Sequence, residues 1–169
     1  MYVLWREWAL MERELKIRVA QLSDVDEIVR VINCAFRAAE SFFVEGDRIS
    51  AETLAAMMSR GSFLLAEDDA GLAGCVYVEL RGPRAYFGLL AVDPARQRRG
   101  LGRRLAQEAE NFGREAGCGV MDIYIVNVRA ELPAIYRGMG YVETGTAPFP
   151  AEVRTKMPCH FVVMSRALG

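Results

Sequence analysis

The chain of 169 residues carries 21 Lys and Arg against 22 Asp and Glu, so its formal net charge is -1. Hydrophobic residues make up 52% and charged residues 25% of the chain, which is typical of one globular domain with a substantial core. A nearly neutral chain excludes general polyanion binding, so any nucleic-acid role would need a local basic patch. No apolar run approaches the ~20 residues of a membrane span. The charged residues near the start argue against a secretory signal.

The cysteines favour a reducing compartment. The four of them (Cys34, Cys75, Cys118 and Cys159) are spread along the chain and form no CxxC pair. The single histidine, His160, has no set of neighbours that would complete a zinc-like site. We therefore expect reduced thiols, a cytoplasmic location and no metal.

Hydrophobic periodicity predicts seven strands and four helices. The strands are expected over residues 15–19, 63–67, 72–80, 85–92, 121–126, 141–145 and 160–165. The helices are expected over residues 23–36, 51–60, 101–116 and 131–139. This order predicts an α/β fold of the α+β type, with a mixed, mostly antiparallel sheet of about seven strands flanked by about four helices.

The chain divides into an extension and one domain. Residues 1–14 are an N-terminal extension compatible with a short helix, because Leu4, Trp8, Met11 and Leu15 recur at helical spacing. Residues 15–169 contain no repeat, low-complexity tract or linker, so they are expected to form a single domain.

The stretch VDPARQRRGLGRRL, residues 92–105, places five arginines around the start of a predicted helix. A helix start carries partial positive charge and favours acids, so a cluster of cations here is unexpected. Gly100 and Gly102 have no Cβ, which lets a ligand approach the backbone closely. Free amides at a helix start, strengthened by arginines, form an anion site. The sequence therefore predicts a phosphate or diphosphate ligand.

Two common phosphate motifs do not match this loop. The third glycine of a dinucleotide-binding GxGxxG is replaced by Leu105, and the Lys-Ser/Thr pair of a Walker A loop is missing. The remaining pattern, Q/R-x-x-G-x-G between an apolar strand and a long helix, resembles the acyl-CoA diphosphate loop of the GNAT-type N-acetyltransferase superfamily. The resemblance extends over roughly residues 15–168 and includes AVDP before the loop and AIYRGMGYVETG after it. It implies an acyl-CoA N-acyltransferase-like fold with acetyl-CoA as cosubstrate.

The resemblance also implies roles for individual residues. Leu90 and Val92 would pair their backbone groups with the pantetheine arm, and an amide there would polarise the thioester carbonyl. Tyr136 stands at the position of the superfamily's general acid, which protonates the departing thiolate; an ordinary core tyrosine is the alternative. The residues implied to hold the CoA diphosphate are Gln97, Arg98, Arg99, Gly100, Leu101, Gly102 and Arg103.

Two departures from the superfamily pattern affect the predicted site. The apolar strand AYFGLLAV has no carboxylate to serve as base, so Glu79 on the preceding strand is the nearest candidate. An amine nucleophile must lose a proton before it attacks, so a base or a water relay is needed. The rivals of Glu79 are Glu40, Glu45 and Asp47, and a solvated strand face would account for Glu79 equally well.

The second departure is Arg129, which replaces an asparagine seven residues before the tyrosine. The nearest asparagine, Asn127, either reaches pantetheine or only shapes the turn.

The predicted activity is transfer of an acetyl or short acyl group from acetyl-CoA to a primary amine by direct attack. The acceptor is expected to be a small-molecule or peptide amine, bound near Phe42, Phe43 and Phe149, with Glu45 or Asp47 attracting its charge. The same aromatic residues would also fit simple packing roles.

Two other functions compete with acyl transfer. A non-catalytic acyl-CoA-binding or sensing module would account for the missing carboxylate. A nucleic-acid site is disfavoured by the net charge and by the two glycines, so neither nucleic acid nor membrane is expected as a partner. Members of the superfamily often dimerise, which makes a homodimer compatible with the resemblance.

Overall fold

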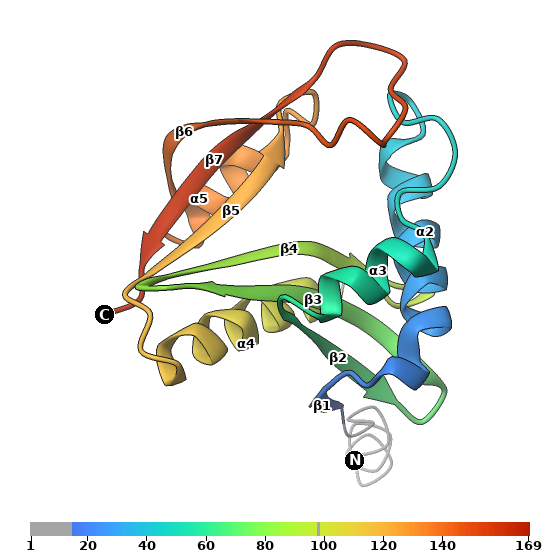
Figure 1. Cartoon of the computed structure of the whole chain (residues 1–169), viewed down its shortest axis with the longest axis horizontal. Helices are drawn as coiled ribbons and strands as arrows, with labels where there is room; N and C mark the ends of the chain where they lie inside the picture. The colour runs from blue at the N-terminus through green and yellow to red at the C-terminus, as the bar shows by residue number, and fades with distance from the viewer. Residues whose placement is uncertain (1–14, 98) are drawn as a thin grey trace, which may run out of the picture.

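The structure, a computed structural model, describes residues 15–97 and 99–169 (Figure 1). The predicted helix within residues 1–14 and the predicted ligand contact Arg98 lie outside the described residues. The strands are β1 (Lys16–Val19), β2 (Ser62–Asp68), β3 (Gly71–Arg81), β4 (Arg84–Val92), β5 (Val120–Val126), β6 (Val142–Pro148) and β7 (His160–Ala167). The helices are α2 (Val25–Glu40), α3 (Ala51–Met58), α4 (Leu101–Glu115) and α5 (Leu132–Gly138), with short 3-10 turns η1 (Leu22–Asp24) and η2 (Pro94–Arg96).

The strands form one seven-stranded sheet in the order β1-β2-β3-β4-β5-β7-β6. Only β4 and β5 pair in parallel; every other neighbouring pair is antiparallel. The predicted fold class, a mixed and mostly antiparallel sheet with four helices, is confirmed. Within the described residues, no helix combines the length and the apolar character needed to cross a membrane.

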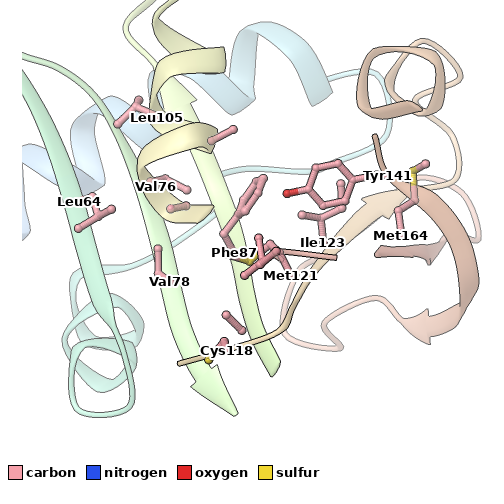
Figure 2. Packing of buried hydrophobic residues seen from close by; sticks show 14 of the residues in the cluster. Leu64, Val76, Val78, Phe87, Leu105, Cys118, Met121, Ile123, Tyr141 and Met164 are labelled. Atoms are coloured by element: carbon pink, nitrogen blue, oxygen red, sulfur yellow. The ribbon is translucent and has the colours of Figure 1, made fainter. Parts of the chain in front are cut away.

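The sheet separates two hydrophobic clusters because successive side chains of a strand point to opposite faces. On β3, Val76 and Val78 pack with residues of α4, whereas Cys75 and Tyr77 pack with residues of α2 and α3. Figure 2 shows the first cluster, where Leu105 of α4 lies beside the strands. The two faces of the sheet are therefore covered by different helices, α4 and α5 on one side and α2 and α3 on the other.

A buried carboxylate ties α4 to the C-terminal strands. Glu110 is 2% exposed, accepts a hydrogen bond from the Tyr141 hydroxyl at 2.8 Å and accepts another from Arg166 at 2.9 Å. Since Tyr141 lies just after α5 and Arg166 lies on β7, this single carboxylate holds three elements in place. All of its bonds are to donors, so the buried charge is satisfied.

Strands β4 and β5 lie together at one end and diverge toward the other (Figure 1). Their parallel pairing covers only Arg84–Phe87 against Val120–Ile123, although β4 continues to Val92 and β5 to Val126. A β-bulge in β4 accompanies this separation: Gly88 pairs with Tyr77 and Ala91 with Cys75, and Leu89 has φ +48°. A bulge bends its strand and increases its twist. The sheet is therefore split along its centre.

The packing of α4 predicts the effect of truncating its central residue. Leu105 is 0% exposed, so Leu105→Ala should lower the free energy of unfolding by about 3 kcal/mol through lost burial and the cavity left behind. Urea denaturation followed by circular dichroism measures this difference. Leu22→Ala is the matched control, because Leu22 is 70% exposed and its truncation should change stability by less than about 0.5 kcal/mol. Equal effects of the two substitutions would contradict the packing described above.

Candidate active site

A cavity of about 1060 Å³ occupies the opening between β4 and β5. On the side of α4 and α5 its wall includes Gly100, Gly102 and Tyr136. On the side of α2 and α3 its wall includes Arg48 and Glu79. Because the sheet is split here, one continuous space connects its two faces. Such a space can bring two ligands into contact from opposite sides of the sheet.

The start of α4 forms one end of this cavity. Gly100 directly precedes the helix and has φ +73°, a left-handed conformation that favours glycine. The first helical hydrogen bond runs from the Arg104 amide to the Gly100 carbonyl at 3.1 Å. The amides of Leu101, Gly102 and Arg103 precede that bond, so they belong to the group that a helix leaves without internal partners. The helix start thus has the geometry of an anion site.

The arginines around this helix start divide into two groups. Arg96 has a side chain 15% exposed and forms ion pairs with Asp68 at 2.9 Å and Asp93 at 3.2 Å, so it holds η2, in which it lies, to the end of β2. Arg104 lies 3.6 Å from Glu108, one helical turn away. Within the described part of the chain, Arg99 and Arg103 form no ion pair. Both are exposed beside the helix start, which leaves their charge available for a ligand.

The second part of β4 presents an open edge to the cavity. Leu90 and Val92 line the cavity, and pairing with β5 has already ended at Phe87. On its other side β4 is still bonded to β3, as in the pair of Val92 with Gly74. An edge of this kind offers unpaired backbone groups to an extended ligand, in the manner of an added strand.

Tyr136 reaches the cavity from α5. Its ring lies 6.3 Å from the ring of Phe87 and 5.9 Å from that of Tyr141. Burial raises the pKa of Tyr136 to about 12, against a smaller opposing effect of the Arg129 charge. Its hydroxyl has no hydrogen-bond partner among the described residues. The group therefore stays protonated at neutral pH and has a proton to donate.

Glu79 lines the other side of the cavity. It accepts hydrogen bonds from the Tyr77 hydroxyl at 2.8 Å and from Arg81 Nε at 2.9 Å. Burial by itself would raise the pKa of Glu79, but the two donors and the Arg81 charge hold that pKa below its ordinary value. The carboxylate is therefore ionised at neutral pH and able to accept a proton, although its bonds to Tyr77 and Arg81 weaken it as a base.

Several predicted residues do not reach the large cavity. Phe42 is 52% exposed, and Phe43 is fully buried in a small cluster with Val44 and Val126. Glu45 borders a separate hollow next to Lys156. The sequence predicts these three near the acceptor, but they belong to the loop between α2 and α3 and their side chains do not line the large cavity.

Two of the predicted acceptor residues do line the cavity, Phe149 and Asp47. The Asp47 carboxylate is 60% exposed and accepts a hydrogen bond from Arg37 at 2.6 Å. Because Arg37 already compensates its charge, Asp47 attracts a cationic amine less strongly than the sequence suggests.

Asn127 also lies outside the cavity lining. Its Oδ1 accepts a hydrogen bond from the His160 amide at 2.8 Å, and its own amide donates to the His160 carbonyl at 2.9 Å. It therefore joins the end of β5 to the start of β7, which matches the turn-shaping alternative. Arg129, the residue at the superfamily's asparagine position, does line the cavity.

The acceptor side contains residues that sequence reasoning missed. The rings of Tyr86 of β4 and Tyr124 of β5 are in tilted contact with centroids 4.8 Å apart, and the Arg81 guanidinium lies 4.4 Å from the Tyr86 ring centroid. A Cβ on Gly88 would collide with the Tyr86 hydroxyl, so only glycine leaves room for this ring. Each of the two central strands carries a tyrosine on the same face, but the sequence could not predict their contact before the pairing of β4 with β5 was known. No cluster of three or more His, Cys, Asp or Glu residues suited to a metal ion occurs in residues 15–97 and 99–169.

Comparison with known proteins defines the family. The model of the acetyltransferase (GNAT) domain family matches residues 36–155, and the chain therefore belongs to the GNAT acetyltransferase family. Among curated proteins, it is similar to the Probable glucosamine 6-phosphate N-acetyltransferase 2 of Oryza sativa subsp. japonica. The two are 33% identical over 103 residues, a segment that is 54% of this chain and 60% of the rice protein.

Solved structures agree on the fold. The ribosomal-protein-S18-alanine N-acetyltransferase from Escherichia coli superimposes with a TM-score of 0.71 at 18% identity, covering 92% of this chain and 94% of the other. The PaiA N-acetyltransferase from Thermoplasma acidophilum, solved in complex with coenzyme A, gives a TM-score of 0.73 at 16% identity, covering 91% and 99%. At these identities the likeness concerns the fold, and the acceptor of the present chain depends on its own residues.

The division of the arginine cluster predicts two different stability effects. Arg96→Ala would leave the carboxylates of Asp68 and Asp93 close together without their shared partner, so the free energy of unfolding should fall by about 1–3 kcal/mol. Arg104→Ala removes an exposed pair on one helix and should cost less than about 0.5 kcal/mol. Chemical denaturation of both variants measures the difference, and an Arg96 variant as stable as the Arg104 variant would contradict the structural role of Arg96.

Proposed function

We propose that this chain transfers an acetyl group from acetyl-CoA to a primary amine by direct nucleophilic attack. The observation that carries the proposal is the single cavity between β4 and β5. It joins an anion-binding helix start and an open strand edge to a chamber that contains a protonated tyrosine and an ionised glutamate. Family membership supports the same reaction class.

The cofactor half of the proposed site begins at the α4 start. The backbone from Gln97 to Gly102 would hold the CoA diphosphate, with Arg98, Arg99 and Arg103 supplying charge. Leu90 and Val92 would pair with the pantetheine arm along the open edge of β4. The thioester would then lie near the β4 bulge, where a backbone amide polarises its carbonyl. Acetyl-CoA supplies the activated acyl group, and the residues of β4 and of the α4 start would position it.

Starting from the acceptor ammonium, the chemistry requires two protons to leave the nitrogen, one before attack and one as the amide forms, and one proton to reach the thiolate. Glu79 would take the proton from the acceptor ammonium, directly or through water. The amine nitrogen then bonds to the carbonyl carbon, the carbon–sulfur bond breaks, and Tyr136 donates its proton to the departing sulfur. The second proton of the nitrogen would then return to Tyr136, directly or through water, which leaves a neutral amide and free CoA thiol. Glu40 is the other buried carboxylate at the cavity, and burial raises the pKa of Glu40, which makes it the rival base. Direct transfer needs no cysteine nucleophile, and the pKa of Cys75 is raised to about 12 by burial.

The acceptor is a primary amine of a small molecule or a peptide. Glucosamine 6-phosphate, named for the rice relative, is one candidate acceptor to test. We also propose a cytoplasmic location, supported by four cysteines that remain free thiols. A non-catalytic acyl-CoA sensor is the alternative, and it predicts acetyl-CoA binding without CoA release in the presence of any amine.

Removing the Tyr136 hydroxyl should slow the chemical step. In Tyr136→Phe the departing thiolate loses its proton donor, so kcat should fall by about 100-fold, while the dissociation constant of acetyl-CoA stays within about twofold. Because the pKa of Tyr136 lies near 12, the wild-type rate should show no loss of this acid below about pH 10. Release of free CoA thiol gives the rates, and calorimetry gives the binding.

Tyr141→Phe is the matched control for that experiment. Tyr141 lies beside Tyr136, but its hydroxyl bonds to Glu110 and it is not part of the cavity wall. This control should reduce stability and leave kcat almost unchanged. Full activity in Tyr136→Phe would refute the general-acid role.

The substitution Gly102→Ala should leave the fold intact or stabilise it while it weakens cofactor binding. A Cβ on Gly102 would contact only Val92 Cγ2, at 3.8 Å, so alanine fits the fold and improves helix propensity by up to about 1 kcal/mol. The same methyl projects beside the free amides, so the dissociation constant of acetyl-CoA should rise about tenfold, equivalent to about 1.4 kcal/mol. Gly138→Ala, with open space around its Cβ and no place in the cavity wall, should leave binding unchanged. Calorimetric titration measures the dissociation constant of acetyl-CoA for both variants. An unchanged dissociation constant in Gly102→Ala would mean that the diphosphate binds elsewhere.

A further inference from the structure

Two loops close one end of the cavity, and we call them together the roof. The first connects α2 to α3 (residues 41–50) and the second connects β6 to β7 (residues 149–159), and they lie side by side (Figure 1). The Glu45 amide donates to the Arg154 carbonyl at 2.8 Å, and the Lys156 amide donates to the Phe43 carbonyl at 2.7 Å. Backbone hydrogen bonds therefore join segments more than 100 residues apart. Residues of both loops line the end of the cavity that lies away from α4.

Arg48 projects from the roof into this enclosed end. Its side chain is 13% exposed, and its guanidinium carbon lies 5.1 Å from the ring centroid of Phe149 and 5.6 Å from that of Phe36. The two rings hold the guanidinium by cation–π contact. Within the described residues, its side chain donates no hydrogen bond, and its Nε is buried without a partner. The nearest carboxylate oxygen, Oε2 of Glu40, is 3.7 Å from Nε and beyond hydrogen-bond range.

Glu40 lies between Arg48 and a second cavity arginine, Arg129. The Glu40 side chain is 6% exposed, its Oε1 is 3.8 Å from Arg129, and its Oε2 has no hydrogen-bond partner within residues 15–97 and 99–169. Arg129 also bonds to Glu131, a mostly exposed residue, at 3.0 Å. In the enclosed space two guanidinium groups thus share one buried carboxylate. Burial lowers the pKa of Arg48, and the charge of Glu40 opposes this effect.

This arrangement leaves polar groups that water or a ligand has to satisfy. A guanidinium carries five N–H donors, and a buried charge is normally paired and hydrogen-bonded. The remaining acids nearby do not supply the missing acceptors: Asp47 bonds to Arg37 at 2.6 Å, and Glu152 is exposed. A carboxylate or phosphate accepts in the plane of the guanidinium and would satisfy these donors directly.

We infer that Arg48, together with Arg129, forms the subsite that binds an anionic group, carboxylate or phosphate, of a small primary-amine acceptor. Glu40 acts as a positioning residue, because its carboxylate lies between the two guanidinium groups and holds each of them in place. The joined loops of the roof bound one end of the cavity, which favours an acceptor small enough to fit beneath them. This inference rests on the proposed acetyl transfer for the identity of the amine, but not for the anion site.

The first experiment measures the anion site without turnover. Inorganic phosphate and acetate are titrated separately into the CoA-saturated protein, with sodium chloride at equal ionic strength as reference, and the melting temperature is followed. At least one of the two anions should stabilise the wild type beyond chloride, and the effective anion indicates phosphate or carboxylate as the natural group. Arg48→Met should abolish that stabilisation. Arg37→Met is the matched control, because Arg37 is 62% exposed and is not part of the wall of the large cavity.

The second experiment uses amines that differ only in the anionic group. Glycine is compared with glycinamide, and glucosamine 6-phosphate with glucosamine, by release of CoA thiol. In at least one pair the anionic member should have kcat/KM about 10- to 100-fold higher than its neutral partner, in line with charge-assisted hydrogen bonds. Arg48→Met should remove this preference by raising KM for the anionic amine, while KM for acetyl-CoA stays unchanged. Arg129→Met provides a second variant should Arg48→Met fail to fold.

The outcomes separate the two proposals. Equal rates with anionic and neutral amines, or a preference that survives Arg48→Met, would overturn the anion subsite and leave acetyl transfer standing. Absence of stabilisation by both anions would overturn the subsite as well. Stabilisation that depends on Arg48, combined with no CoA release from any amine, would support the anion subsite and contradict the proposed enzymatic function.

Discussion

The separation of β4 from β5 is the constraint on which the site depends. Parallel pairing ends at Phe87 and Ile123, and the bulge around Leu89 directs the rest of β4 away from its neighbour. An unbroken sheet would satisfy these backbone groups with a strand. Because the sheet is open here, the edge of β4 is available to a ligand, and the cavity extends from one face of the sheet to the other. A cosubstrate and an acceptor can then approach the same point from opposite sides.

Two buried glutamates show how the same residue type serves structure in one place and binding in another. Glu110 accepts hydrogen bonds from Tyr141 and Arg166, so its charge is compensated and it holds three elements together. Glu40 lies within 4 Å of two arginines, yet one of its oxygens and the Nε of Arg48 are left without partners within the described residues. Buried polar groups without partners are expensive, and they are tolerated where a ligand supplies what the protein lacks. The first network belongs to the core, and the second faces the cavity.

Much of the architecture followed from local pattern. The continuous apolar run of β3 and the helical stripe of α4 were sufficient to predict strand and helix, because β3 is buried on both faces and α4 buries one. The glycine-rich helix start at Gly100 was also predictable as part of the cavity, since glycines and arginines at a helix start together favour a bound anion. The acceptor side was not predictable: Phe42, Phe43 and Glu45 were expected in the cavity and instead serve the roof or face away from it. Arg48 was not predicted, because nothing in its local sequence marks it as buried.

The difference between the two halves of the site has a physical origin. The proposed cofactor half is built from one continuous segment, β4 through the start of α4, so its backbone conformation and charges are encoded by neighbouring residues. The acceptor half is assembled from α2, β3, β5 and two loops that meet through backbone hydrogen bonds such as that between Glu45 and Arg154. Backbone hydrogen bonds can form between almost any pair of residues, so the amino-acid sequence gives little indication of them. Fold class, strand order along the chain and the glycine-arginine loop at the start of α4 were therefore accessible from the amino acids alone, whereas the cavity and the poorly compensated Arg48 in its wall exist only once distant loops pack together.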